Sequence, residues 1–270
     1  PVPEHAPVAL QPLPAREAAA PLALRDLANW MRHPARYFLR KRLGVVFDRD
    51  DDAPEDSEPF HLAGLERHTV ARQLLDFLPT DWAALPDSAP QHHLGQALQR
   101  LRRAGLLPLG TPGDHIVAQW GEEWLPPLQT WQGLQRDHAQ PGARVPLMRT
   151  VDLQNAINLI ATGAYPESAG GQNDLDPEPL PSLQDWLDGL RCNAAGQAVW
   201  MQLTPSRLLQ DAKKRSLRAD LMIQPWLCSL AAAASGTELR GLLVARDVWL
   251  EWEPLEPKAA RTQLDRWLYA

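Results

Sequence analysis

Hydrophobic residues recur at helical spacing within residues 24–46, and this stretch anchors the prediction for the whole chain. The apolar positions are Leu24, Leu27, Ala28, Met31, Ala35, Phe38 and Leu39. Such a stripe lies along one side of a helix and predicts contact with a core. Pro34 cannot donate the amide hydrogen bond of a continuous helix, but it suits the first position of a new one. We therefore predict two helices meeting at Pro34, with Phe38 and Leu39 buried and the second helix ending at Gly44.

Three further stretches have helical spacing: residues 62–78, 91–106 and 116–138. The last contains three tryptophans on one side: Trp120, Trp124 and Trp131. Aromatic residues at this spacing predict a core or interface helix, with stacking on single-stranded DNA as the alternative. Pro126 and Pro127 predict a break that divides this helix in two. Up to about residue 142 the pattern predicts only helices.

Strand patterns begin near residue 143, where residues 143–151 predict the first strand. Two strands joined by the turn sequence RCNAAG are predicted as a pair: residues 182–190 and 197–205. Residues 217–234 predict a long helix that ends at Ser235 and Gly236. Two more strands and a final helix follow: residues 238–245, 248–254 and 257–270. Helices followed by strands around a helix indicate an α/β or α+β domain.

Other segments show no pattern of burial. Residues 1–21 are rich in proline and predict an extended linker, as expected for a domain cut from a longer protein. Residues 48–58 contain seven acidic residues and predict a solvated loop. The pattern gives one domain, residues 22–270, with a helical part up to residue 142 and a sheet-containing part from residue 143.

The composition of the chain limits the classes of protein to which it can belong. The 270 residues are 44% hydrophobic and carry a net charge of −6, so any contact with nucleic acid must use a local patch. Two cysteines, Cys192 and Cys228, are too few for a structural metal site and indicate a reducing cytoplasm. No apolar run reaches the length of a membrane span, and no secretory leader is visible, so no membrane contact is expected.

The first two predicted helices carry the local patch that such a contact needs. Its basic residues are Arg32, Arg36, Arg40, Lys41 and Arg42. A run of this kind is either a solvated face on a core helix or a docking surface for DNA or an acidic partner. The sequence leaves both readings open.

The same region resembles the C-terminal domain of RecC, the gamma subunit of exodeoxyribonuclease V. The matching residues are Arg32, His33, Pro34, Arg36, Phe38, Leu39, Arg42, Leu43, Glu58, Pro59, Phe60, Gly64, Leu65 and Arg67. The resemblance extends in weaker form over most of the chain and skips residues 150–180, which we interpret as an insertion.

The resemblance implies a fold and a function. The fold is a degenerate PD-(D/E)XK restriction-endonuclease-like core, a mixed sheet flanked by helices, preceded by a helical region. The function is that of a non-catalytic domain in the RecBCD helicase–nuclease, which acts in double-strand-break repair and recombination. The domain would scaffold RecB-like and RecD-like subunits and guide forked or single strands of DNA.

An active member of the nuclease fold needs carboxylates at the ends of adjacent strands to hold Mg²⁺. Asp188 is a candidate for the first of them. The next predicted strand, residues 197–206, contains no Asp, Glu or Lys. His33 stands where cluster-bearing relatives have cysteine, so no iron–sulfur cluster is expected. We therefore predict no catalytic residue, no metal ligand and no cofactor.

Two other functions stay open. An active Mg-dependent DNase would use His68, Asp188, Asp211 and Lys213, although residues 207–218 predict a helix or loop rather than the strand that this site needs. The other alternative is a protein-interaction module that does not contact DNA. The absence of a P-loop motif and of a G-x-S-x-G motif argues against ATP hydrolysis and against a serine hydrolase.

Overall fold

The computed structural model describes residues 20–46, 62, 64–151, 181–211, 213 and 215–269. Its helices are α1 Leu24–Arg32, α2 Pro34–Arg42, α3 Gly64–Asp76, α4 Ala89–Arg103, α5 Gly110–Asp137, α7 Ala219–Ala234 and α8 Pro257–Tyr269. Its strands are β1 Gln140–Pro141, β2 Val145–Thr150, β3 Ser182–Leu187, β4 Leu190–Cys192, β5 Ala198–Leu203, β6 Leu209–Asp211, β7 Ser216–Leu217, β8 Arg240–Val244 and β9 Trp249–Trp252. The predicted linker, acidic loop and insertion fall almost entirely outside the described residues. None of the described helices is both long and apolar enough to cross a membrane.

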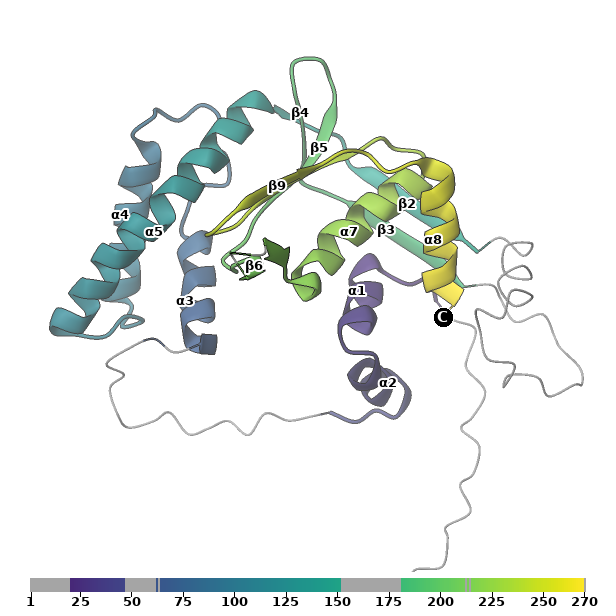
Figure 1. Cartoon of the computed structure of the whole chain (residues 1–270), viewed down its shortest axis with the longest axis horizontal. Helices are drawn as coiled ribbons and strands as arrows, with labels where there is room; N and C mark the ends of the chain where they lie inside the picture. The colour runs from purple at the N-terminus through teal and green to yellow at the C-terminus, as the bar shows by residue number, and fades with distance from the viewer. Residues whose placement is uncertain are drawn as a thin grey trace, which may run out of the picture.

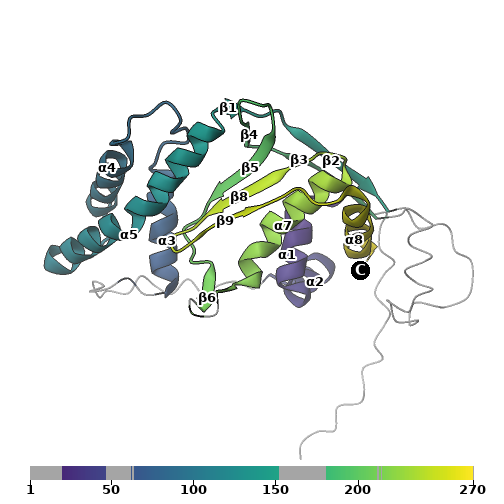
Figure 2. The same ribbon diagram turned by 45° about the horizontal axis from the view of Figure 1, so that its top comes forward.

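Five strands form a mixed sheet in the order β1-β4-β5-β8-β9. β5 and β8 are parallel, and the other neighbouring pairs are antiparallel. The parallel pair needs a crossover to bring the chain back to the same end of the sheet, and α7 provides it (Figure 1). Figure 2 shows β5, β8 and β9 side by side, with α7 running along the sheet. The mixed α/β class predicted from the sequence is confirmed.

The alternation of side chains along β5 explains why the sheet separates two hydrophobic cores. Trp200 packs in the core that includes α7 and α8, whereas Met201 and Leu203 pack against the core of α3, α4 and α5. Successive residues of a strand point to opposite faces, so one short strand serves both cores. α3, α4 and α5 therefore pack against the face of the sheet opposite α7.

A separate ribbon of β2 and β3 holds α1 in place. Asp185 of β3 accepts a hydrogen bond from the amide of Leu24, with an N···O distance of 2.8 Å. This contact satisfies one of the free amides in the first turn of α1. Leu24, Leu27 and Ala28 are buried, so the first part of the predicted apolar stripe does face a core.

The second part of the predicted apolar stripe, which lies on α2, does not face a core. α2 begins at Pro34 and the chain turns at Gly44, where φ is +64°, so the predicted helix break and helix end are confirmed. The predicted burial of Phe38 and Leu39 is wrong: Phe38 is 48% exposed and Leu39 is only half-buried. The reason is that α2 packs mainly on α1 and reaches neither core.

α5 is continuous through Pro126 and Pro127, so the predicted break is also wrong. A proline in a helix interior costs about 3 kcal/mol relative to alanine. Here Trp124 and Leu128, on either side of the pair, are fully buried, and their packing outweighs that cost. All three tryptophans predicted to be core residues are buried.

The predicted pairing of residues 182–190 with residues 197–205 is only partly correct. The first range contains two strands: β3, which pairs with β2, and β4, which pairs with β5. Gly189 separates them with φ at +71°, a conformation that glycine adopts without a steric penalty. Residues 207–218, predicted as a helix or loop, contain the small antiparallel hairpin of β6 and β7.

Candidate functional site

A polar groove opens at the carboxyl ends of the parallel strands β5 and β8. Gln202 and Thr204 continue the face of β5 that carries Trp200, but they lie where the core ends. Leu243 of β8, the neighbour of Gln202 across the sheet, lies beside them in the groove. Open α/β sheets bind ligands outside the carboxyl ends of their strands, so this groove is the leading candidate for a ligand site.

One face of α1 lines the same groove with Arg25, Asn29 and Arg32. These residues are four and three positions apart, which places them on one side of the helix. The Nε of Arg32 donates to the main-chain oxygen of Asp220 in the first turn of α7, at 3.3 Å. This bond holds Arg32 in place, whereas Arg25 has no hydrogen-bond or ion-pair partner among the described residues.

The rest of the groove comes from α3 and α7. Arg72 of α3 is exposed and, like Arg25, has no partner among the described residues. Gln224 lies within the first two turns of α7, whose N-terminal end carries partial positive charge. The groove has a volume of about 470 Å³, and none of its described lining residues is Asp, Glu or aromatic. Its three arginines therefore make it suited to an anion.

The basic residues predicted from the sequence lie beside this groove. They occupy adjoining helices: Arg32 at the end of α1, and Arg36, Arg40, Lys41 and Arg42 on α2. Arg36 and Arg40 are exposed and have no hydrogen-bond or ion-pair partner within the described part of the chain. The Nζ of Lys41 lies 3.9 Å from Oδ1 of Asp26. Arg32 belongs to both the groove and this basic surface, so the two adjoin.

A second set of arginines surrounds Glu123 of α5 at the same end of the sheet. Its carboxylate lies 2.8 Å from Nη2 of Arg67, 3.0 Å from Nη2 of Arg207 and 3.4 Å from Nη1 of Arg246. Burial tends to raise the pKa of Glu123, but the hydrogen bond from Arg207 and the charges of Arg246 and Arg67 outweigh it and lower the pKa. The three guanidinium groups outnumber this carboxylate, and the charge of Asp247, which also acts on Arg246, offsets only part of the excess.

The residues of the alternative nuclease site are not gathered at one point. His68 is exposed on α3. Asp188, between β3 and β4, pairs with Arg144, whose Nη2 lies 3.1 Å from Oδ2. Asp211 ends β6 and accepts a hydrogen bond from the amide of Lys213 at 2.8 Å. In the described residues no three His, Cys, Asp or Glu side chains lie close enough to hold a metal ion.

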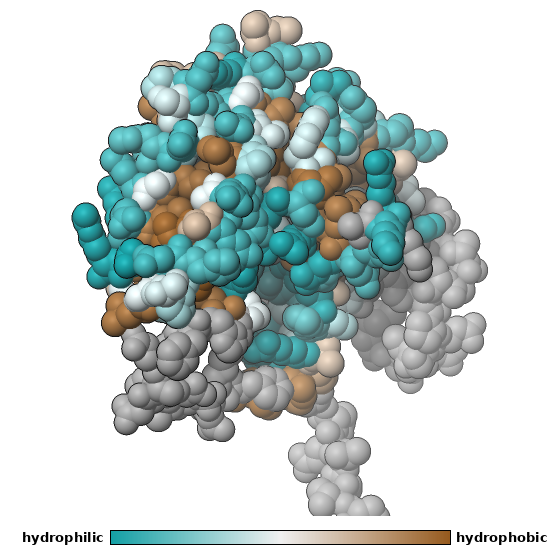
Figure 3. Space-filling model, turned by 60° about the vertical axis from the view of Figure 1, so that its left-hand side comes forward, coloured by the Kyte–Doolittle hydropathy of each residue, from teal (hydrophilic) through white to brown (hydrophobic). Residues whose placement is uncertain are grey.

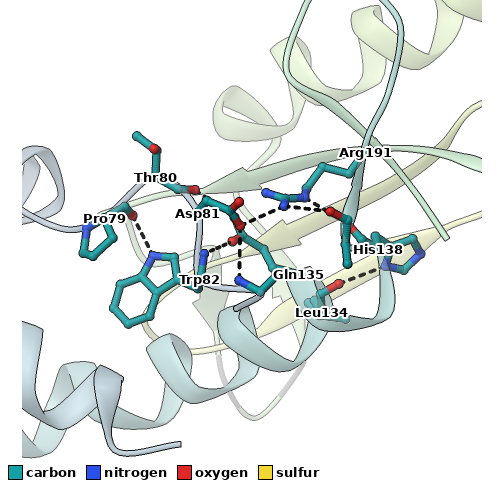
Figure 4. Close-up of polar contacts among 10 residues, drawn as sticks. Pro79, Thr80, Asp81, Trp82, Leu134, Gln135, His138 and Arg191 are labelled. Carbon is teal, nitrogen blue, oxygen red and sulfur yellow. Dashed lines mark hydrogen bonds and ion pairs between the residues drawn. The ribbon is translucent and has the colours of Figure 1, made fainter. Parts of the chain in front are cut away.

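Polar contacts fix the end of α5 against the sheet (Figure 4). Nη2 of Arg191, on β4, lies 2.9 Å from Oδ1 of Asp81. Nε of the same arginine donates a hydrogen bond to the main-chain oxygen of His138, also at 2.9 Å. The buried side chain of Gln135 accepts a hydrogen bond from the amide of Trp82 at 2.7 Å. These contacts join the α3–α4 connection, α5 and β4, and their role is to position the helical part.

An apolar hollow of about 690 Å³ lies between α3 and the α4–α5 connection. Its apolar lining includes Leu65, Val70, Leu106, Leu107, Pro108 and Leu109. Figure 3 looks at this end of the molecule and shows hydrophobic side chains gathered in the middle of a mostly hydrophilic face. Leu65 and Leu109, at its rim, are 69% and 64% exposed.

Sequence reasoning identified the basic surface of α2 but missed most of the groove. Arg25 and Asn29 had a local signal, because they share a helix face with Arg32, away from the apolar stripe. No local signal in the sequence marked Arg72, because α3 reaches the groove only through the packing of the tertiary fold. The strand without acidic residues was recognised, and Gln202 of that strand lines the groove.

Comparison with known proteins supports the resemblance found in the sequence. A family model described as the RecC C-terminal domain matches residues 19–270. The RecBCD enzyme subunit RecC of Escherichia coli (strain K12) is 27% identical over 193 residues, which make up 72% of this chain. The matched region is 14% of the length of that relative. Because the family model covers nearly the whole chain, the chain belongs to the RecC C-terminal domain family.

Proposed function

We propose that the chain is a non-catalytic, DNA-contacting domain of a RecC-type subunit. In this proposal the parent protein works in a RecBCD-type helicase–nuclease in double-strand-break repair and recombination. Its partners are RecB-like and RecD-like subunits and forked or single-stranded DNA. Membership of the RecC C-terminal domain family supports the proposal, as does the relative that is a subunit of the RecBCD enzyme.

Gln202 is the observation that carries the non-catalytic role. The order β4, β5, α7, β8, with β5 and β8 parallel, is compatible with a PD-(D/E)XK core, and we propose that the domain is a degenerate form of it. Gln202 then lies near the carboxyl end of a central strand, where an active nuclease needs an acid. An amide oxygen carries no charge to offset that of Mg²⁺, and the described lining of the groove offers no carboxylate.

The apolar hollow supports the part of the proposal that concerns partner subunits. Its exposed leucines lie on α3 and on the α4–α5 connection, and no residue lines both the hollow and the groove. This separation supports one surface for protein partners and another for DNA. It is also the observation that favours the second candidate function, an interaction module without DNA contact.

The absence of nuclease activity is the direct test of the non-catalytic role. We expect linear duplex and single-stranded DNA to stay intact when incubated with the chain and Mg²⁺ or Mn²⁺. Gel electrophoresis of end-labelled DNA measures this. Cleavage that disappears in Asp188→Ala or Asp211→Ala would overturn the proposal in favour of an active DNase. Cleavage that persists in both variants would indicate a contaminating enzyme. The protein would then be repurified and the assay repeated.

A further inference from the structure

We propose that the groove lined by Arg25, Arg32 and Arg72 binds the phosphodiester backbone of one DNA strand without a metal ion. The inference rests on the proposed function, since it takes DNA to be the ligand. It goes further because it assigns the contact to particular residues and states which part of DNA they hold. The basic surface of α2 then becomes an extension of this site.

The charges in the groove point to phosphate. Arg25 and Arg72 come from different helices and face the same groove, and each lacks a hydrogen-bond or ion-pair partner among the described residues. Arg32 uses its Nε on the main-chain oxygen of Asp220, which leaves its terminal nitrogens for a ligand. A guanidinium group presents paired donors that match two oxygens of one phosphate. Three such groups with no lining carboxylate make an unbalanced positive site.

The remaining lining residues indicate that the backbone is held rather than the bases. Asn29, Thr204, Gln202 and Gln224 can donate hydrogen bonds to phosphate and sugar oxygens. The described lining includes no aromatic side chain on which a base could stack. Contacts of this kind position a strand without reading its sequence.

The size of the groove favours a single strand. A volume of about 470 Å³ lies within the range of small-ligand sites, so a nucleotide-sized portion of a strand fits. A duplex is too wide to enter a recess of that size and would reach only its rim. The groove therefore distinguishes a separated strand from paired DNA by shape.

Metal independence follows from the same residues. In an active nuclease a metal ion held by carboxylates neutralises the phosphate. Here the arginines supply the positive charge directly, and Gln202 adds no negative charge that a metal ion would have to offset. Mg²⁺ in solution then acts only as a competing counterion on the DNA.

The test uses fluorescence anisotropy of a labelled oligo-dT with the whole 270-residue chain, in EDTA, across a range of salt. The groove variant is Arg25→Gln with Arg72→Gln, because neither side chain holds another part of the described structure. Each lost single-strand phosphate contact reduces the slope of log affinity against log salt by about 0.7, so we expect a reduction of about 1.4. The affinity for a blunt duplex should change much less.

Two further variants make the result specific. Arg103→Gln with Lys258→Gln removes the same charge from α4 and α8, outside the groove, and should leave the slope unchanged. Arg36→Gln with Arg40→Gln tests the surface of α2 separately. Thermal melts of all variants should agree with the wild type, since the substituted side chains are exposed.

The outcomes separate the inference from the proposed function. If the wild-type chain binds neither single-stranded nor forked DNA, both are overturned. If it binds but the groove variant matches the wild type, the groove assignment alone is overturned and the contact lies elsewhere, as a loss in the α2 variant would show. An equal loss in the control variant, or an equal loss on duplex DNA, would also overturn the single-strand site.

Discussion

Glu123 is the residue that balances the charge at the basic edge of the sheet. Its side chain is 14% exposed, and its carboxylate lies among three arginines. We expect Glu123→Ala to reduce the free energy of unfolding by about 1.5–3 kcal/mol, because it removes charged hydrogen bonds and the ion-pair partner of Arg246, whose side chain is only 12% exposed. Glu122→Ala is the matched control: that side chain is exposed, and its loss should cost less than about 0.5 kcal/mol. Urea denaturation measures both.

The same residue predicts a dependence on pH. The pKa of Glu123 is lowered in the folded chain, so its contribution is fully present above the ordinary pKa of glutamate, about 4.3. The contribution is lost as the pH falls through the lower folded pKa. The difference in unfolding free energy between wild type and Glu123→Ala should therefore be constant above about pH 5.5 and shrink in more acidic buffer. A difference that grows on acidification would contradict the ion-pair account.

At the scale of elements, α1 and α2 share one predicted apolar stripe but differ in how deeply they pack. Leu27 of α1 is 3% exposed, whereas Phe38 of α2 is 48% exposed. Leu27→Ala should cost about 2–5 kcal/mol, the range for a buried leucine, and Phe38→Ala less than about 1 kcal/mol. Melting curves of the two variants give the comparison. A large loss for Phe38→Ala would mean that α2 is packed against a core in solution.

The elements show what local pattern can and cannot predict. The break at Pro34, the end of α7 at Ser235 and the strands β8 and β9 were correct, because proline, glycine and alternating residues act locally. The continuity of α5 through its prolines and the exposure of α2 depend on packing, which no local pattern contains. Most of the groove was missed for the same reason, since Arg72 and Gln202 meet only in the tertiary fold.

At the scale of the whole molecule, the two faces of the sheet and its carboxyl-end edge have different roles. Its two faces are buried in separate cores, and its carboxyl-end edge collects arginines from α1, α3 and the connections that follow β5 and β8. A chain with a net charge of −6 thus gathers a local positive edge. Because three arginines line the groove and three more surround Glu123, this edge can attract DNA although the molecule as a whole does not.

The central claim is that this edge of the sheet holds DNA by arginines and not through a metal ion. The affinity of the chain for forked DNA, measured in EDTA and in Mg²⁺, tests this claim most directly. We predict saturable binding in EDTA, with an affinity at least as high as in Mg²⁺ at equal ionic strength, because the divalent ion competes for the phosphates. The DNA should be recovered uncut in both buffers. Binding that requires Mg²⁺, or DNA that is cut when Mg²⁺ is present, would contradict the account.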